Sequence, residues 1–310
     1  MTSTPPTWYQ MIHALELMTQ EERKAAMPAT LSTDELVARF PELAAVKACD
    51  FAIEGPHGTI PCRSYRLPGD GTRACLVWAH GGGFVAGDLD MAEAHWVGLM
   101  IAARGVNVMS IDYHKCLDGA RFPLPSDDVL AAWLWAVTNA AWLGTTAQNI
   151  HLGGASAGAN LVAGVTKRLR DGAGLMPKST ILAYPLVHQE LPPASAELAA
   201  RLATESTAFT AEAVQQINMH YAGTREALDD PYAFASNGDI SGQPPFFILN
   251  SEADSLRSSG EAYAAQLEAA GVTVVATYEP GTSHGHLNEP ALPAAATSIQ
   301  RIFGWIDTYR

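Results

Sequence analysis

The sequence has 310 residues, of which 48% are hydrophobic and 16% are charged, below the usual charged share of about a quarter. This balance excludes a disordered chain. It favours a large buried core and leaves room for a buried pocket or a homodimer interface. Lys+Arg 19 against Asp+Glu 32 give a net charge of −13, which disfavours nucleic acids and membranes as partners.

The cysteines and the start of the chain bear on its compartment. A chain of this length does not need disulfides, and no C-x-x-C spacing occurs among Cys49, Cys62, Cys75 and Cys116, so we expect reduced thiols. Residues 1–20 lack the basic start and apolar centre of a secretory signal. The most apolar stretch, 129–143, is too short to span a bilayer. We therefore expect a cytoplasmic protein.

The first third of the chain contains helical patterns and then a hairpin. Apolar residues at helical spacing predict a helix over 8–27, and a capping-box pattern of Ser32 and Glu35 predicts a short helix over 32–40. Strand signals at 50–54 and 60–67 are separated by turn residues. They predict an antiparallel hairpin at the edge of a sheet.

From residue 74 on, apolar runs typical of strands buried on both faces alternate with helical patterns. The predicted strands are 74–79, 106–111, 149–152, 180–184, 245–249 and 272–277. The predicted helices are 91–104, 127–142, 157–170, 260–270 and 294–306. This alternation predicts an α/β fold with a mostly parallel sheet and helices on both faces.

The segment 187–243 interrupts the alternation. It contains no strong strand, but it has helical stretches near 194–203 and 210–221. An insertion of this length after a strand is typical of a lid over the carboxyl edge of a sheet. We therefore expect N-terminal cap helices in 1–45 and a catalytic domain over 46–310, with a helical cap insertion at about 187–243.

The segment Gly154-Ala155-Ser156-Ala157-Gly158 follows a predicted strand and matches G-x-S-x-G. This pattern is that of a nucleophile elbow, which holds a serine on a strained strand-to-helix turn. The other residues of 153–159 are all Gly or Ala, as the close approach of helix and strand requires. The same pattern also occurs by chance in small-residue turns, so the rest of the chain has to decide.

A nucleophilic serine needs donors for an oxyanion, a base, and a group that orients the base. The segment His80-Gly81-Gly82-Gly83-Phe84 directly follows a predicted strand. Its consecutive glycines allow backbone N–H groups to converge on one point, as in the oxyanion loop of lipases and esterases. The alternative, a flexible glycine turn, is disfavoured by the position directly after a strand.

Candidates for the acid and the base follow the last two predicted strands. Either Glu252 or Asp254 could orient an imidazole, or could instead cap a helix. His284 is the candidate base, although His284 and His286 could also be a pair of metal ligands. No third ligand with zinc-type spacing stands nearby. We expect no metal and no other cofactor.

Together these residues resemble the hormone-sensitive-lipase-like branch of the α/β-hydrolase esterases, from about residue 50 to the C-terminus. The chain order of serine, acid and histidine is that of the α/β-hydrolases. Further matching pieces are Asn160, Asp230-Pro231, Pro244-Pro245, the segment 252–256 and Gly260-Glu261-Ala262-Tyr263.

The resemblance implies a serine carboxylic-ester hydrolase that acts on small soluble esters through an acyl-enzyme. It implies Ser156 as nucleophile, His284 as base and Asp254 as the orienting acid. It also implies an oxyanion hole built from the N–H groups of Gly82, Gly83 and Ala157. Two alternatives stay open, an amide or formamide hydrolase with the same triad and a non-catalytic small-molecule-binding member of the fold. The second is disfavoured because all three triad members are present.

Three positions depart from the family pattern. Ala155 stands where the family usually has Asp or Thr, and His286 stands where it usually has an apolar residue. The segment Tyr113-His114-Lys115-Cys116-Leu117-Asp118 replaces a loop that normally starts with tyrosine and arginine and ends in a proline and an acid. Because this loop borders the substrate pocket in the family, we expect it to affect which substrate binds.

Overall fold

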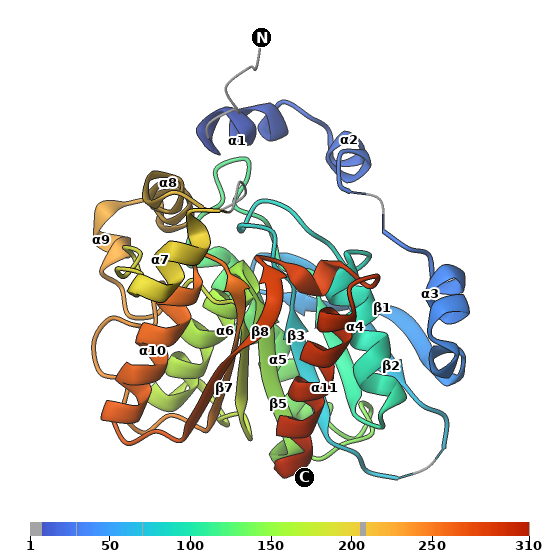
Figure 1. Ribbon diagram of the computed structural model, residues 1–310. Helices are drawn as coiled ribbons and strands as arrows, with labels where there is room; N and C mark the ends of the chain where they lie inside the picture. Colours follow the sequence, from blue (N-terminus) through green and yellow to red (C-terminus); the bar gives the residue numbers. More distant parts are fainter. Residues whose placement is uncertain (1–7, 29, 70, 205–208, 310) are drawn as a thin grey trace.

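The structure is a computed structural model that describes residues 8–28, 30–69, 71–204 and 209–309. Residues 1–7 of the predicted cap segment and residues 205–208 of the predicted insertion lie outside the described residues. A single sheet runs through the molecule, and helices cover both of its faces (Figure 1).

The sheet has eight strands in the order β1-β2-β4-β3-β5-β6-β7-β8. Their bounds are β1 (Lys47–Gly55), β2 (Gly58–Arg66), β3 (Cys75–Ala79), β4 (Asn107–Ile111), β5 (Ile150–Ala155), β6 (Thr180–Ala183), β7 (Phe246–Ala253) and β8 (Val274–Ser283). β2 pairs antiparallel with β1 and β4, and all other neighbours are parallel. The predicted mostly parallel sheet with a hairpin at its edge is confirmed.

Five long helices cover the sheet, namely α4 (Ala92–Ala103), α5 (Leu124–Thr138), α6 (Ala157–Arg168), α10 (Arg257–Ala269) and α11 (Pro293–Thr308). Side chains alternate between the two faces of each strand. Val77 of β3 therefore packs in the same apolar cluster as α5 and α6, while Trp78 packs with α4 and α11. Strands β3, β4 and β5 are buried along their whole length, and their mostly apolar sequence is typical of strands covered on both faces.

The predicted single helix over 8–27 is wrong, because the chain forms α1 (Trp8–Glu16) and α2 (Gln20–Ala25) with a break between them. The Thr19 hydroxyl accepts a hydrogen bond from the N–H of Glu22, and the Glu22 carboxylate accepts one from the N–H of Thr19. This capping box starts a new helix. Thr19 and Glu22 have the spacing of a capping box, so the break between the two helices could have been predicted from the sequence.

The next N-terminal elements are α3 (Thr33–Arg39) and the short 3-10 helix η1 (Pro41–Ala45). α3 begins with the predicted capping box of Ser32 and Glu35. Leu36 and Leu43 pack in the same apolar cluster as Trp96 of α4. These two elements therefore lie beside the sheet, whereas α1 lies above it (Figure 1).

The insertion forms α7 (Ala196–Leu202), α8 (Ala211–Ala222) and the unpredicted short helix α9 (Arg225–Leu228). α1 packs against α8, so an N-terminal element and the insertion meet above the carboxyl edge of the sheet (Figure 1). The division of the chain into cap and catalytic domain stays a prediction. Across residues 8–28, 30–69, 71–204 and 209–309, no helix has the length and apolar character needed to cross a membrane.

Candidate active site

Ser156 occupies the sharp turn between β5 and α6. Its φ of 52° and ψ of −117° fall outside the regions that non-glycine residues usually adopt. The Ser156 N–H donates to the carbonyl oxygen of Ala183 at 2.9 Å. A Cβ atom on Gly158 would collide with the carbonyl oxygens of Ala79 and His80. The chain therefore has the elbow geometry expected from its small residues, and only glycine fits at position 158.

Ser156, His284 and Asp254 form one hydrogen-bonded line. Ser156 Oγ lies 2.9 Å from His284 Nε2, and His284 Nδ1 lies 2.7 Å from Asp254 Oδ2. Each residue directly follows the end of a strand, because β5, β7 and β8 end at residues 155, 253 and 283. The carboxyl ends of parallel strands meet at one edge of the sheet, which explains how residues so distant in sequence come together.

The carboxylate of Asp254 is oriented on both sides. The side chain is 1% exposed, and its Oδ1 accepts the N–H of Leu256 at 2.9 Å. Burial alone lowers the pKa of His284, but the charge and hydrogen bond of Asp254 outweigh it, with a smaller contribution from the charge of Glu93. The net effect raises the pKa of His284 above its ordinary value. The imidazole of His284 is therefore a stronger base than an unperturbed histidine.

Glu252 lies inside β7, because this strand extends to Ala253 and not only to the predicted residue 249. Its carboxylate pairs with Arg201 of α7 at 2.7 Å and accepts the N–H of Gly281 at 2.8 Å. Of the two acids left open by the sequence pattern, Asp254 is the one in contact with His284. Glu252 instead joins the insertion to the end of β8, just before the histidine.

The glycine loop after β3 lies beside Ser156. Gly82 and Gly83 have φ values of 109° and 60°, which glycine adopts without strain. Among the described residues, none accepts a hydrogen bond from the N–H of Gly82 or Gly83. The N–H of Ala157 stands at the first position of α6, where a helix offers no internal acceptor. These three donors are thus free for a ligand oxygen.

Glu93 is a buried acid that the sequence reasoning missed. It is 1% exposed, and its carboxylate accepts hydrogen bonds from the N–H of Gly81, the hydroxyl of Tyr184 and the side-chain amide of Asn288. It therefore joins the glycine loop to the turn after His284. The one available signal was a lone carboxylate in the otherwise apolar helix α4.

His286 lies close to His284 but does not face the cavity. It is fully buried, and its Nδ1 and Nε2 lie 2.8 and 2.7 Å from the hydroxyls of Ser251 and Ser298. Burial lowers the pKa of His286 to about 4. Both ring nitrogens are engaged, so neither is available to a metal ion. In the part of the chain that the structure describes, no group of three His, Cys, Asp or Glu side chains could hold a metal.

A cavity of about 1010 Å³ opens onto Ser156 and His284. Its apolar lining comes from the core, from the insertion and from α1, and includes Trp8, Met11, Leu186, Phe209, Ile217 and Leu256. The edge of the Phe209 ring meets the His284 ring at a centroid distance of 5.0 Å. An acyl or alcohol group of modest size would therefore be surrounded by apolar side chains.

The loop 113–118 does not border this cavity, contrary to the expectation from the family resemblance. Its residues instead line a second cavity of about 1480 Å³. The backbone N–H and Nδ1 of His114 donate to Asp128 Oδ2 at 2.8 and 2.7 Å, and the Tyr113 hydroxyl donates to the carbonyl of His80 at 2.9 Å. These bonds hold the loop against His80, at the start of the glycine loop.

Residues 76–288 match the model of the alpha/beta hydrolase fold family. The chain is 31% identical to the carboxylic ester hydrolase LipN of Mycobacterium tuberculosis over 246 residues, which are 78% of this chain and 65% of LipN. It is 32% identical to the ethyl acetate hydrolase of Pseudomonas putida over 231 residues, 73% of this chain and 71% of that protein. The chain thus spans about two thirds of the length of these curated relatives.

Among solved structures, an esterase from Pyrobaculum calidifontis superimposes with a TM-score of 0.79 at 26% identity, covering 98% of this chain and 99% of that one. The chain belongs to the α/β-hydrolase fold family. This confirms the predicted fold and the predicted resemblance to its esterases.

Proposed function

We propose that this chain is a serine carboxylic-ester hydrolase with Ser156 as nucleophile, His284 as general base and Asp254 as the acid that orients the base. One observation carries the proposal, the continuous line of 2.9 and 2.7 Å contacts from Ser156 Oγ through the imidazole to Asp254. A relative named as a carboxylic ester hydrolase and a structural neighbour named as an esterase support it.

The reaction proceeds through an acyl-enzyme. Ser156 Oγ attacks the ester carbonyl while His284 Nε2 takes its proton. The oxyanion of the tetrahedral intermediate accepts hydrogen bonds from the N–H groups of Gly82, Gly83 and Ala157. His284 then protonates the leaving alcohol, and in the second half of the reaction it activates water against the acyl-enzyme.

The substrate is a small ester with a compact acyl group. The apolar lining of the cavity at Ser156 suits the apolar parts of such an ester, and a relative whose name gives ethyl acetate as its substrate supports the small size. The cytoplasmic location and the homodimer stay predictions.

The test is a matched pair of substrates offered to the purified protein, a p-nitrophenyl ester and the p-nitroanilide with the same acyl group. We expect a much higher kcat/KM for the ester, and no turnover above background in the Ser156→Ala variant. A kcat/KM for the anilide equal to or above that for the ester would make the chain an amide hydrolase. No turnover of any substrate by the intact protein would support the non-catalytic binding alternative.

A further inference from the structure

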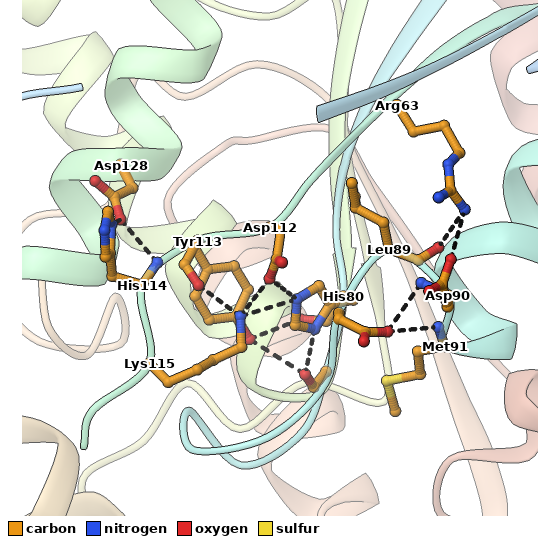
Figure 2. Close-up of polar contacts among 12 residues, drawn as sticks. Arg63, His80, Leu89, Asp90, Met91, Asp112, Tyr113, His114, Lys115 and Asp128 are labelled. Atoms are coloured by element: carbon orange, nitrogen blue, oxygen red, sulfur yellow. Dashed lines mark hydrogen bonds and ion pairs between the residues drawn. The ribbon is translucent and has the colours of Figure 1, made fainter. Parts of the chain in front are cut away.

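Lys115 lies beside His80, the residue that begins the glycine loop, at the centre of a polar network that the catalytic line does not use (Figure 2). Its Nζ donates to Asp112 Oδ1 at 2.6 Å and to the carbonyl oxygen of Tyr113 at 2.5 Å, and it lies 3.3 Å from His80 Nε2. The Lys115 side chain is 17% exposed, and the side chain of His80 is fully buried. A charged amine therefore contacts the first residue of the loop that carries the free N–H groups.

These contacts select one tautomer of His80. Its Nδ1 lies 2.6 Å from the carbonyl oxygen of Gly81, and because a carbonyl only accepts, Nδ1 must carry the proton. An ammonium group only donates, so the Lys115 contact requires an unprotonated Nε2. Both contacts are satisfied only in the neutral ring with its proton on Nδ1.

Asp112 competes with Lys115 for the same ring nitrogen. Asp112 Oδ1 lies 3.4 Å from His80 Nε2, and a carboxylate in that place favours a proton on Nε2. The ammonium of Lys115 donates to the same carboxylate oxygen at 2.6 Å and lies 3.3 Å from the ring nitrogen, so its positive charge offsets the charge of Asp112 there. Without Lys115, Asp112 would favour a proton on Nε2, and in the neutral ring an unprotonated Nδ1 would then face the Gly81 carbonyl. Only a second proton on the ring would keep the bond to that carbonyl.

The direction of the Gly81 carbonyl decides where the next N–H points. This oxygen accepts from His80 Nδ1 at 2.6 Å and from the Tyr113 hydroxyl at 3.2 Å, and among the described residues neither partner lines the cavity at Ser156. In a trans peptide the C=O of one residue and the N–H of the next point in opposite directions. Because the Gly81 carbonyl is bonded to residues outside the cavity, the N–H of Gly82 points the opposite way, toward the cavity that Gly82 and Ser156 line.

We propose that Lys115 is a positioning residue that fixes the tautomer of His80 and thereby keeps the N–H of Gly82 directed at the oxyanion of the transition state. The inference rests on the proposed function. Lys115 touches neither the substrate nor the reacting atoms. Because the N–H of Gly82 gains its full hydrogen bond only in the transition state, the loss of Lys115 should lower kcat and leave KM nearly unchanged.

The test compares Lys115→Met, which keeps the chain length and removes the ammonium, with Lys115→Arg, which keeps a cationic donor. The control is Lys178→Met, because among the described residues the Lys178 side chain donates only to the side chain of Asn149, away from the site. We expect Lys115→Met to lose about 10- to 100-fold in kcat with KM within about twofold. The same variant should lose a similar factor in affinity for a boronic acid transition-state analogue, while Lys115→Arg keeps more activity and Lys178→Met is unchanged.

A purely structural role would lower the melting temperature and reduce activity only through unfolding, so thermal melts accompany the kinetics. The tautomer is read directly on the wild-type protein by long-range ¹H–¹⁵N NMR of labelled histidine, with His80 assigned from a His80→Gln variant. We expect a proton on Nδ1 of His80. A proton on Nε2 would overturn the inference even if Lys115→Met failed to fold.

A folded Lys115→Met variant with wild-type kcat would also overturn it. In that outcome the wild-type enzyme still turns over the ester and is still labelled at Ser156, so the proposed function stands. If instead the wild-type protein neither turns over the ester nor is labelled at Ser156, the proposed function itself is wrong.

Discussion

The carboxylate of Asp254 lies 2.7 Å from Nδ1 of His284, whereas the carboxylate of Glu252, two residues earlier, is bound to Arg201. We expect Asp254→Asn to lose about 10⁴-fold in kcat, as losing the orienting carboxylate did in an established serine protease. Glu252→Gln should cost far less, because it loosens the contact between α7 and the end of β8 at Gly281 and leaves His284 with its carboxylate partner. Steady-state kinetics of both variants checks this, and equal losses or the reverse order would mean that the acids are wrongly assigned.

The activity should fall on the acid side as His284 becomes protonated. His284 accepts a proton only when neutral, and its pKa is raised because Asp254 outweighs the effect of burial. The acid limb of kcat/KM should therefore lie above the value of about 6.5 for an unperturbed histidine. In Asp254→Asn the residual activity should show a limb at lower pH, because its charge no longer favours the imidazolium. A wild-type limb well below 6 would contradict this origin of the shift.

No metal should be needed, although two histidines stand two residues apart. His286 gives its two ring nitrogens to the hydroxyls of Ser251 and Ser298. Dialysis against a chelator should leave the activity unchanged. His286→Ala should instead lower the free energy of unfolding by about 1–3 kcal/mol, because it leaves buried hydroxyls unpaired. Loss of activity on chelation with recovery on adding zinc would overturn this prediction.

Much of this site could be predicted because its chemistry depends on local patterns. The elbow at Ser156 and the glycine loop are each one short, unbroken stretch of sequence. The acid and the base each follow a strand whose apolar run is visible in the sequence. Asp254 could be separated from Glu252 only through the family resemblance, since two acids two residues apart at the end of a strand look equivalent until their contacts are known.

The residues that hold the site could not be predicted in the same way. Glu93 and Lys115 act through contacts with segments distant in sequence, and no pattern around either residue indicates which loop it will meet. The expectation that the loop 113–118 borders the substrate cavity was wrong for the same reason. The loop is held by bonds of His114 to Asp128 on another element, and no local pattern indicates them. The break before α2 was different, since the Thr19 and Glu22 capping box was present in the sequence.

The enzyme should prefer short acyl chains. The described part of the insertion carries polar residues such as Gln189, Glu190, Ser195, Glu197 and Arg201, where a lipid-binding lid would need a broad apolar face. A series of p-nitrophenyl esters from acetate to palmitate should give the highest kcat/KM among the short chains. A rate that rises through the long chains and jumps above the solubility limit would indicate a true lipase instead.

The most direct test of the central claim is covalent labelling of Ser156. Treatment with an organophosphate should abolish activity and add one phosphoryl group, and peptide mass spectrometry should locate it on Ser156. The Ser156→Ala variant should be folded, inactive and unlabelled. An adduct on any other serine with parallel loss of activity, or full activity in a labelled or Ser156→Ala protein, would contradict the assignment of Ser156 as the nucleophile.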